Sequence, residues 1–362
     1  MTALLGTTTG PASAPGGGGD PRGAATRHGR ARARRSRRRI VVTLLLAVLL
    51  LAVVATSLMV GQTFYTPGEV VRVILGEQVP GASFTVGTLR LPRVVMAVLT
   101  GTAFGLAGIA FQTLLRNALA APDIIGISAG ASAAAVVGLV VLGLSEGLVS
   151  IVAVVAGLAT ALLIYLLAFK DGVVGTRLIL IGIGISAMLE SVVAYVIVRA
   201  AEWDLQVAMR WLTGSLNNAQ WSAILPLALA IACFAPLLLS QARNLQLMQQ
   251  GDDSATALGV RVERTRLLVI LSAVALISFA TAASGPIAFV AFLAGPIAAR
   301  LVGPGSLMVP SALVGALLVC SADLVGQFAF DARYPVGVIT GGLGAPFLVY
   351  LLIRTNRAGG SL

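Results

Sequence analysis

Long apolar runs dominate this chain and set the class of fold that it can adopt. Apolar residues make up 57% of the 362 residues and charged residues only 11%, whereas soluble domains have about 25% charged residues. The runs are roughly twenty residues long, the length that a helix needs to cross a hydrocarbon core. A transmembrane barrel would show shorter segments of alternating polarity instead. The sequence therefore predicts an all-α polytopic membrane protein.

About ten of these runs qualify as membrane-spanning helices, and together they predict one transmembrane domain at residues 40–357. The eighth run is short and is interrupted by Gly295-Pro296. We expect the spans at residues 40–61, 93–115, 124–143, 148–168, 178–199, 222–240, 267–284, 287–302, 309–328 and 336–354.

A basic tail at residues 1–39 precedes the first span. Nine of the 25 basic residues lie between Arg22 and Arg39, in a segment rich in Gly, Pro, Ala and Arg that we expect to be disordered. Such a segment beside a span is typical of a cytoplasmic anchor that fixes the topology and touches anionic lipid. Because much of the net charge of +11 gathers in this tail, we do not expect a nucleic-acid partner.

The distribution of basic residues predicts the orientation of the chain. If the N-terminus is cytoplasmic, 19 of the 25 basic residues fall in cytoplasmic segments and six in external ones. Cytoplasmic loops carry the excess of Lys and Arg in membrane proteins. We therefore expect a multi-pass protein of the bacterial cytoplasmic membrane with both termini in the cytoplasm.

The chain has few residues that could perform covalent chemistry or bind a metal. His28 is the only histidine and lies in the tail, while Cys233 and Cys320 sit inside apolar runs and are typical of core packing. No GxxxxGK[ST] motif occurs, so we expect any ATP-driven step to need another subunit. We expect neither a metal site nor a cofactor, and we predict that the chain is not an enzyme.

Glu190 and Asp323 are the only acids inside the expected spans. Acids within a membrane are functional candidates by default. Each could take part in ion coupling or line a pathway, or could bond a nearby hydroxyl group such as that of Ser186, Ser191 or Ser321. The spans offer no basic partner for either acid, so the sequence alone leaves these roles open.

Two polar regions flank the expected spans and could bind partner proteins. Arg90 and Arg93 bracket the start of the second span, where they could anchor the helix at the interface or dock an acidic patch of an external partner. The long segment 241–266 is polar and compatible with a short helix, and a cytoplasmic partner could grip it.

Several separated blocks of this sequence resemble one family, the membrane permeases of binding-protein-dependent ABC importers for iron–siderophore complexes, haem and cobalamin. The order and spacing of the blocks are specific, and they cover most of the membrane portion. The blocks are LRLPR (89–93), LAG-x3-Q-x2-LRN (106–117), GISAGAS (126–132), RLILIGI (177–183), WLTGS (211–215), ALG (257–259), GPIAFV (285–290) and PVGVITGGLGAPF (335–347).

The resemblance implies a type II ABC importer permease: ten helices per subunit, a dimer around a central pathway, two cytoplasmic ATP-binding subunits and an extracytoplasmic substrate-binding protein. It also implies roles for individual positions. Arg90 and Arg93 match arginines that dock the binding protein, and Arg333 could replace a third that stands where this chain has Gln327. The other implied sites are the ATPase-coupling elbow (Gly251, Asp252, Asp253, Ala255, Leu258 and Gly259), a cytoplasmic gate (Gly175 and Thr176) and a pathway helix (Ser186 and Glu190).

Some positions depart from the family pattern. The chain has NALAAP at 117–122 where NPLADP is usual, and Gly295-Pro296 where a Pro-His or Pro-Gln pair is common. These departures leave the fold and the class intact, bear on the substrate, and hint at a heteromeric pair with a second permease.

From these observations we expect the permease subunit of an ATP-driven importer of iron(III)–siderophore complexes. Haem or cobalamin import remains open, as does an ion-coupled secondary transporter, which would leave the segment 241–266 without a role. An integral-membrane enzyme would need clustered polar residues at the membrane face, and the sequence has none. The sequence does not distinguish a homodimer from a heterodimer.

Overall fold

The computed structural model describes residues 21–120, 122, 126–168 and 175–357, and every regular element in this part is a helix. Two short stretches have the wider winding of a π-helix: η1 leads into α3, and η2 continues α4. The elements are α1 (Pro21–Met59), α2 (Pro67–Ile74), η1 (Ser83–Arg90), α3 (Leu91–Leu114), α4 (Ile127–Val136), η2 (Val137–Val141), α5 (Glu146–Ala168), α6 (Gly175–Arg199), α7 (Glu202–Leu212), α8 (Trp221–Ser240), α9 (Ala242–Met248), α10 (Asp252–Ala257), α11 (Val262–Ser284), α12 (Val290–Val302), α13 (Met308–Phe328) and α14 (Val336–Arg357).

Seven helical segments of the described chain are long and apolar enough to cross a membrane, and three further apolar helices are shorter. Each of the ten expected spans coincides with one of these ten segments. The short ones are Ile127–Val141, Val290–Val302 and Val336–Leu351. The structure therefore confirms an all-helical membrane protein and the position of each apolar run, while the crossing of the three short helices remains a prediction.

Two compact units make up the chain, Met1–Val41 and Val42–Leu362. In the first unit, α1 begins at Pro21, so the described residues 21–39 are helical where we expected disorder. Arginine and alanine are both good helix formers, and no proline follows Pro21 in this stretch to interrupt the helix. The second unit is a bundle of helices that contains all the positions discussed below.

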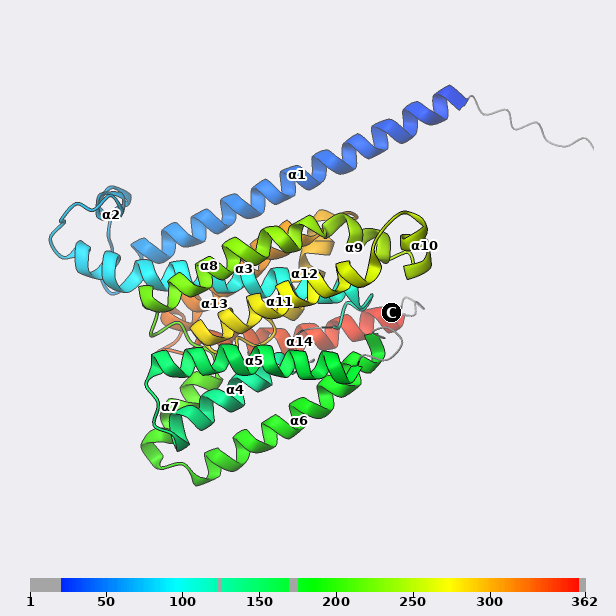
Figure 1. The fold of residues 1–362 in the computed structure, drawn as a ribbon. Coiled ribbons are helices and arrows are strands. Elements are labelled where there is room, and N and C mark those ends of the chain that lie inside the picture. The colour runs from blue at the N-terminus through cyan, green and yellow to red at the C-terminus, as the bar shows by residue number, and fades with distance from the viewer. Residues whose placement is uncertain (1–20, 121, 123–125, 169–174, 358–362) are drawn as a thin grey trace, which may run out of the picture. The chain divides into compact units, whose positions relative to one another are not determined.

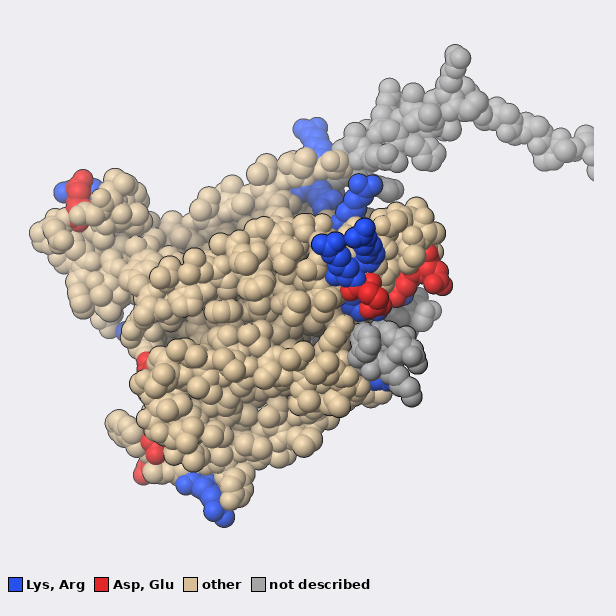
Figure 2. Space-filling view, viewed as in Figure 1, with Lys and Arg blue, Asp and Glu red and all other residues tan. Residues whose placement is uncertain are grey.

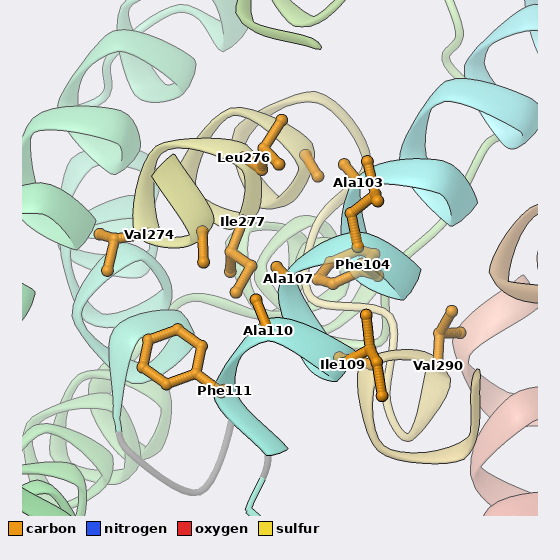
Figure 3. Close-up of a cluster of buried hydrophobic side chains, with 14 of the residues drawn as sticks. Ala103, Phe104, Ala107, Ile109, Ala110, Phe111, Val274, Leu276, Ile277 and Val290 are labelled. Carbon is orange, nitrogen blue, oxygen red and sulfur yellow. The ribbon is translucent and has the colours of Figure 1, made fainter. Parts of the chain in front are cut away.

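Helix α3 forms the centre of the bundle. Its buried residues continue around most of its circumference, and it packs against α13, α11, α12 and α8. Figure 3 shows side chains of α3 interleaved with those of α11 and α12. Close approach depends on glycine: a β-carbon on Gly101 would lie 2.4 Å from the carbonyl oxygen of Gly315 on α13, so the two backbones touch.

The bundle has two ends that differ in their elements (Figure 1). One, the α7 end, carries α2 and the loops around α7. The other, the α10 end, carries α9 and α10. Figure 2 shows that the face in view is almost free of charged side chains between the ends, whereas basic and acidic groups gather at them. This banding is what a bundle needs if a membrane surrounds its middle.

A capping box fixes the start of α2 at the α7 end. The side chain of Thr66 accepts a hydrogen bond from the backbone N–H of Glu69, and the Glu69 carboxylate accepts one from the backbone N–H of Thr66. Hydrogen bonds from the backbone and side chain of Thr66 lower the pKa of the Glu69 carboxyl below its ordinary value.

Candidate functional site

At the α7 end, Arg93 of α3 forms a bidentate ion pair with Asp323 of α13. Arg93 Nε lies 2.8 Å from Oδ2 of Asp323, and Nη2 lies 2.7 Å from Oδ1. The side chains are only 18% and 8% exposed, respectively. Arg93 Nη1 also donates to Oδ1 of Asn217, and Gln327 donates to Asp323. The group, which we name the Arg93–Asp323 cluster, joins α3, α13 and the loop after α7.

This cluster corrects one expectation from the sequence. Asp323 was expected to have no basic partner in the spans, and a hydroxyl group such as that of Ser321 was a candidate partner. Instead, α3 and α13 run in opposite directions, with Gly101 against Gly315 and Gly105 against Ser311, so the first turn of α3 meets the C-terminal part of α13 and brings Arg93 to Asp323. A buried carboxylate is stable only when it is paired and hydrogen-bonded, and here both conditions are met.

Arg90 also uses its guanidinium group within the chain. It donates to the backbone carbonyls of Leu58, Met59 and Thr63, which are acceptors at and just beyond the C-terminal end of α1. A cation at this place satisfies carbonyls that the helix leaves without partners. Gly61 allows the approach, because a β-carbon there would collide with the guanidinium. Arg90 therefore caps α1.

Three of the sequence blocks meet by backbone contact beside the Arg93–Asp323 cluster. The N–H of Ser215 donates to the carbonyl of Ser284 at 2.8 Å, and the N–H of Gly337 donates to the carbonyl of Gly214 at 3.1 Å. Gly214 and Gly285 both have positive φ angles, of 69° and 72°, which glycine adopts most readily. The blocks WLTGS, GPIAFV and PVGVITGG thus form one tight junction at the α7 end.

Arg333 lies in the segment between α13 and α14, at the same end, and is exposed. Gln327, where the resemblance led us to expect a docking arginine, donates to Asp323. Of the three arginines expected to dock an external protein, the structure therefore leaves Arg333 most open, while Arg90 and Arg93 bind groups of their own chain.

At the α10 end, the expected coupling elbow forms the short helix α10 between two glycines with positive φ, Gly251 at 114° and Gly259 at 84°. Asp252 pairs with Arg116 at the end of α3 and with Arg266 of α11. Leu258 is 60% exposed. The elbow therefore presents an apolar side chain outward on a segment held by ion pairs.

The positions predicted for the elbow divide by exposure. Asp253, Leu258 and Gly259 are exposed, but Ala255 is fully buried and packs with Met248 and Val260. Ala255 therefore contributes to the small core that holds α10. A substitution there would disturb the elbow itself, so it cannot test surface contact with a partner.

Helix α6 carries the two expected pathway residues. Ser186 is buried, donates to the carbonyl of Gly182 in its own helix, and lies against Gly126, where a β-carbon would approach its Oγ to 2.4 Å. Glu190, one turn further on, is exposed. The structure thus separates the two residues: Ser186 packs within the bundle, and Glu190 lies on the open face of α6.

The gate expected at Gly175 and Thr176 falls at the first turn of α6. Their side chains lie outside the described residues, as does the whole of the preceding segment 169–174.

Sequence reasoning missed four members of the charged clusters, namely Asn217, Gln327, Arg116 and Arg266. A usable signal existed for Arg116 and Arg266, since each stands at a predicted span end near the elbow acids. The spacing of four residues from Asp323 in one expected span was a signal for Gln327, whereas Asn217 lies in a loop whose position depends on the tertiary fold. Within the described residues, no group of three or more His, Cys, Asp or Glu side chains could hold a metal ion.

The chain matches the model of the FecCD transport family over residues 49–354. It is 39% identical over 302 residues to the ferric enterobactin transport system permease protein FepG of Escherichia coli, an alignment that covers 83% of this chain and 92% of FepG. It is 40% identical over 310 residues to the achromobactin transport system permease protein CbrC of Dickeya dadantii, with 84% and 89% covered.

More distant similarities agree with this assignment. The cobalamin import system permease protein BtuC of Halobacterium salinarum is 34% identical over 280 residues, which cover 75% of this chain and 74% of BtuC. A solved metal-chelate type ABC transporter in an inward-facing conformation superposes with a TM-score of 0.78 at 28% identity, covering 86% of this chain and 98% of that one. The chain belongs to the FecCD transport family, a family of membrane permeases.

Proposed function

We propose that this chain is the membrane-spanning subunit of an ATP-driven importer of iron(III)–siderophore complexes. The observation that carries the proposal is the similarity to FepG and CbrC at 39–40% identity over more than four fifths of the chain, because both names specify siderophore transport. The face in view in Figure 2 is almost free of charged side chains between the two ends of the bundle, as a membrane-spanning subunit requires.

The proposed orientation places the α10 end in the cytoplasm and the α7 end outside a bacterial cytoplasmic membrane. The basic residues of the α10 end support it, because cytoplasmic loops carry the excess of Lys and Arg. Both termini are then cytoplasmic, and the three short apolar helices cross the membrane with the seven long ones, which makes ten spans.

ATP hydrolysis is assigned to separate cytoplasmic subunits, since the chain has no GxxxxGK[ST] motif. We assign their contact to the elbow formed by α10 and its flanking glycines. The exposed Leu258 supports this assignment, because an apolar side chain on a polar segment is suited to a pocket of a partner.

An extracytoplasmic binding protein is assigned to the α7 end. Arg333 is suited to attract an acidic partner because it is exposed. Arg90 already binds the carbonyls at the end of α1, and Arg93 already binds Asp323. Either arginine can dock a partner only if an acidic residue of that partner binds the same guanidinium group as well.

A second permease subunit is assigned to the open face of α6. Glu190 is exposed in the middle of this apolar helix, and a carboxylate facing lipid at the centre of a span costs about 2.5–3.5 kcal/mol. A partner subunit or a water-filled path would remove that cost. We therefore propose that Glu190 faces a pathway between two subunits, with Ser186 supporting the helix and Gly175-Thr176 at its cytoplasmic entrance.

Cobalamin import is the second candidate, favoured by the similarity to BtuC of Halobacterium salinarum, and haem import remains a third. The family membership argues against an ion-coupled secondary transporter. Asp323 gives it no support, because its carboxylate is bound by Arg93 within the bundle and does not stand free in a pathway.

Reconstitution tests the proposal. Proteins that co-purify with a tagged copy are identified, and the complex is placed in proteoliposomes with its binding protein. Uptake of a radioactive iron(III)–siderophore complex should depend on ATP and exceed uptake of haem and cobalamin. ATP-dependent uptake of cobalamin alone would transfer the assignment to the second candidate, and uptake without ATP would refute an ATP-driven importer.

A further inference from the structure

One carboxylate joins three segments at the α10 end. Asp252, the first residue of α10, receives Arg116 on Oδ1 and Arg266 on Oδ2, the second at 2.7 Å. Arg116 follows the end of α3, and Arg266 lies in the second turn of α11, where it is 11% exposed. The two arginines approach different oxygens of Asp252. The elbow is therefore tied at once to the helix at the centre of the bundle and to its neighbour.

Arg116 has a backbone conformation that is unusual for its residue type. Its φ angle is 52°, one of two positive values at non-glycine residues in the described chain. A helix commonly ends at such a left-handed residue, but glycine is the usual occupant because other residues are strained there. Glycine would end α3 without strain but would carry no side chain to reach Asp252. Arginine at this position therefore accepts backbone strain and in return forms the ion pair with Asp252.

Besides these ion pairs, only a few apolar contacts hold the elbow. Helix α10 has only six residues, far too few for a helix to be stable alone. Gly251 and Gly259 stand at its two ends, and glycine permits more backbone conformations than any other residue. The buried contacts of α10 form a small cluster of Met248, Ala255 and Val260, against which Leu114 of α3 and Val262 of α11 also pack. Charge pairing at Asp252 therefore adds the directional restraint.

We propose that Asp252 is a positioning residue whose carboxylate locks the elbow to α3 and α11 through Arg116 and Arg266. The proposal rests on the proposed function insofar as the elbow meets an ATP-binding subunit. A movement imposed on α10 then passes directly to α3. The other end of α3 holds the Arg93–Asp323 cluster, so the same helix has an ion pair at each end of the bundle.

The first test measures the elbow without any ATP-binding subunit. A spin label is placed at 258 through Leu258→Cys, in full-length protein that carries Cys233→Ser and Cys320→Ala, in lipid nanodiscs. Asp252→Asn and Arg116→Gln should each increase the mobility of the label. Glu263→Gln is the matched control: Glu263 also pairs with Arg266, but within α11 alone, so its loss should leave the label unchanged. Equal mobility in all three variants would overturn the proposal.

The second test measures coupling in the assembled importer. Asp252→Asn and Arg116→Gln should each reduce substrate imported per ATP hydrolysed by about two- to fivefold, the factor expected from a partly exposed ion pair. The double variant should lose no more than Asp252→Asn alone, because that substitution already removes the contact with Arg116 as well as the contact with Arg266. Losses that multiply would mean that Asp252 acts on the partner directly, and would overturn the positioning role.

The two tests separate the possible failures. If the label becomes mobile in Asp252→Asn but transport and ATP hydrolysis stay coupled, the lock exists and the elbow is not the ATPase contact. If the label does not respond, the lock itself is refuted, whatever the elbow binds.

Discussion

Gln112 of α3 supplies a hydrogen bond that Pro296 of α12 cannot make. Proline has no N–H group, so its place inside α12 leaves the carbonyl of Phe292, four residues earlier, without its helical donor. The side-chain nitrogen of Gln112 donates to that carbonyl at 3.0 Å in a buried site. Gly295 gives the room, because a β-carbon there would lie 2.0 Å from the amide oxygen of Gln112.

This relationship predicts a compensating pair of substitutions. Gln112→Met keeps the length of the side chain but leaves the carbonyl of Phe292 buried and unpaired, which should lower stability by about 1–3 kcal/mol. Pro296→Ala restores a backbone donor. The double variant should therefore lose less stability than Gln112→Met alone, as measured by unfolding of the purified protein in detergent. Additive losses would show that the amide packs without replacing the missing bond.

The Arg93–Asp323 cluster predicts a second cycle. Asp323→Asn strands a largely buried guanidinium and should destabilise the protein by about 3 kcal/mol, whereas Arg93→Met with Asp323→Leu replaces the pair with apolar groups and should come close to wild-type stability. Unfolding midpoints of the purified variants check this. If the double variant is as unstable as the single one, hydrogen bonds to Asn217 and Gln327 matter more than the ion pair.

The same double variant separates stability from docking. Its association with the binding protein should be weaker than that of the wild type if Arg93 also meets a partner acid, and unchanged if Arg93 is structural. Arg333→Glu serves as the comparison, since this exposed arginine should weaken association in a salt-dependent way without any change in unfolding.

Leu258 offers a direct test of the elbow surface. Leu258→Arg places a charge where we propose an apolar contact with the ATP-binding subunit, so that subunit should be lost on purification while the permease remains folded in the membrane. Pull-down from detergent extracts measures the retained subunit. The position is preferable to Ala255, which is buried, and to Gly259, whose positive φ would strain any other residue. Full retention together with normal uptake would contradict the contact.

Glu190 should not be an obligatory proton carrier. Glu190→Gln preserves size and hydrogen bonding but removes the titratable group, so substantial uptake should persist, including when the proton gradient is collapsed at constant ATP. Uptake into proteoliposomes with and without a protonophore provides the measurement. A variant that assembles normally but transports nothing, together with wild-type uptake abolished by the protonophore, would favour ion coupling.

Helix α2 should loosen on acidification. Because the folded chain lowers the pKa of Glu69, its ionised form stabilises α2 above the unfolded pKa, and this contribution disappears as the pH falls through the lowered folded value. At pH 7, amides of α2 should exchange faster in Glu69→Gln than in the wild type. The difference should shrink at pH values low enough to protonate Glu69, after correction for intrinsic exchange. A difference that persists there would assign the effect to packing.

The sequence was sufficient for the positions of the apolar helices, because run length and hydropathy report burial in a membrane one segment at a time. It was insufficient for contacts that depend on how segments pair. Asp323 and Arg93 are 230 residues apart, and the sequence around either residue does not indicate that the other is its partner. Gln112 likewise reads as an ordinary polar residue near a span end until α12 lies against it.

In the elbow, too, the sequence predicts the local structure but not the tertiary contacts. Its two glycines and short helical stretch are visible in the sequence. The burial of Ala255 is not, since it depends on Met248 of the preceding helix folding back over α10. Residue roles at Gly175, Thr176, Glu190 and Arg333 stay predictions, because they concern partners rather than the fold of this chain.

The wide separation of Arg93 and Asp323 has a consequence for biogenesis. Ribosomes add about 5–20 residues per second, so Asp323 is synthesised roughly ten to fifty seconds after Arg93. During that time the early helices stand in the translocon or the bilayer with an unmatched cation at one end. The contacts of the central helix α3 with α13, including this ion pair, can therefore form only after the penultimate span has been made.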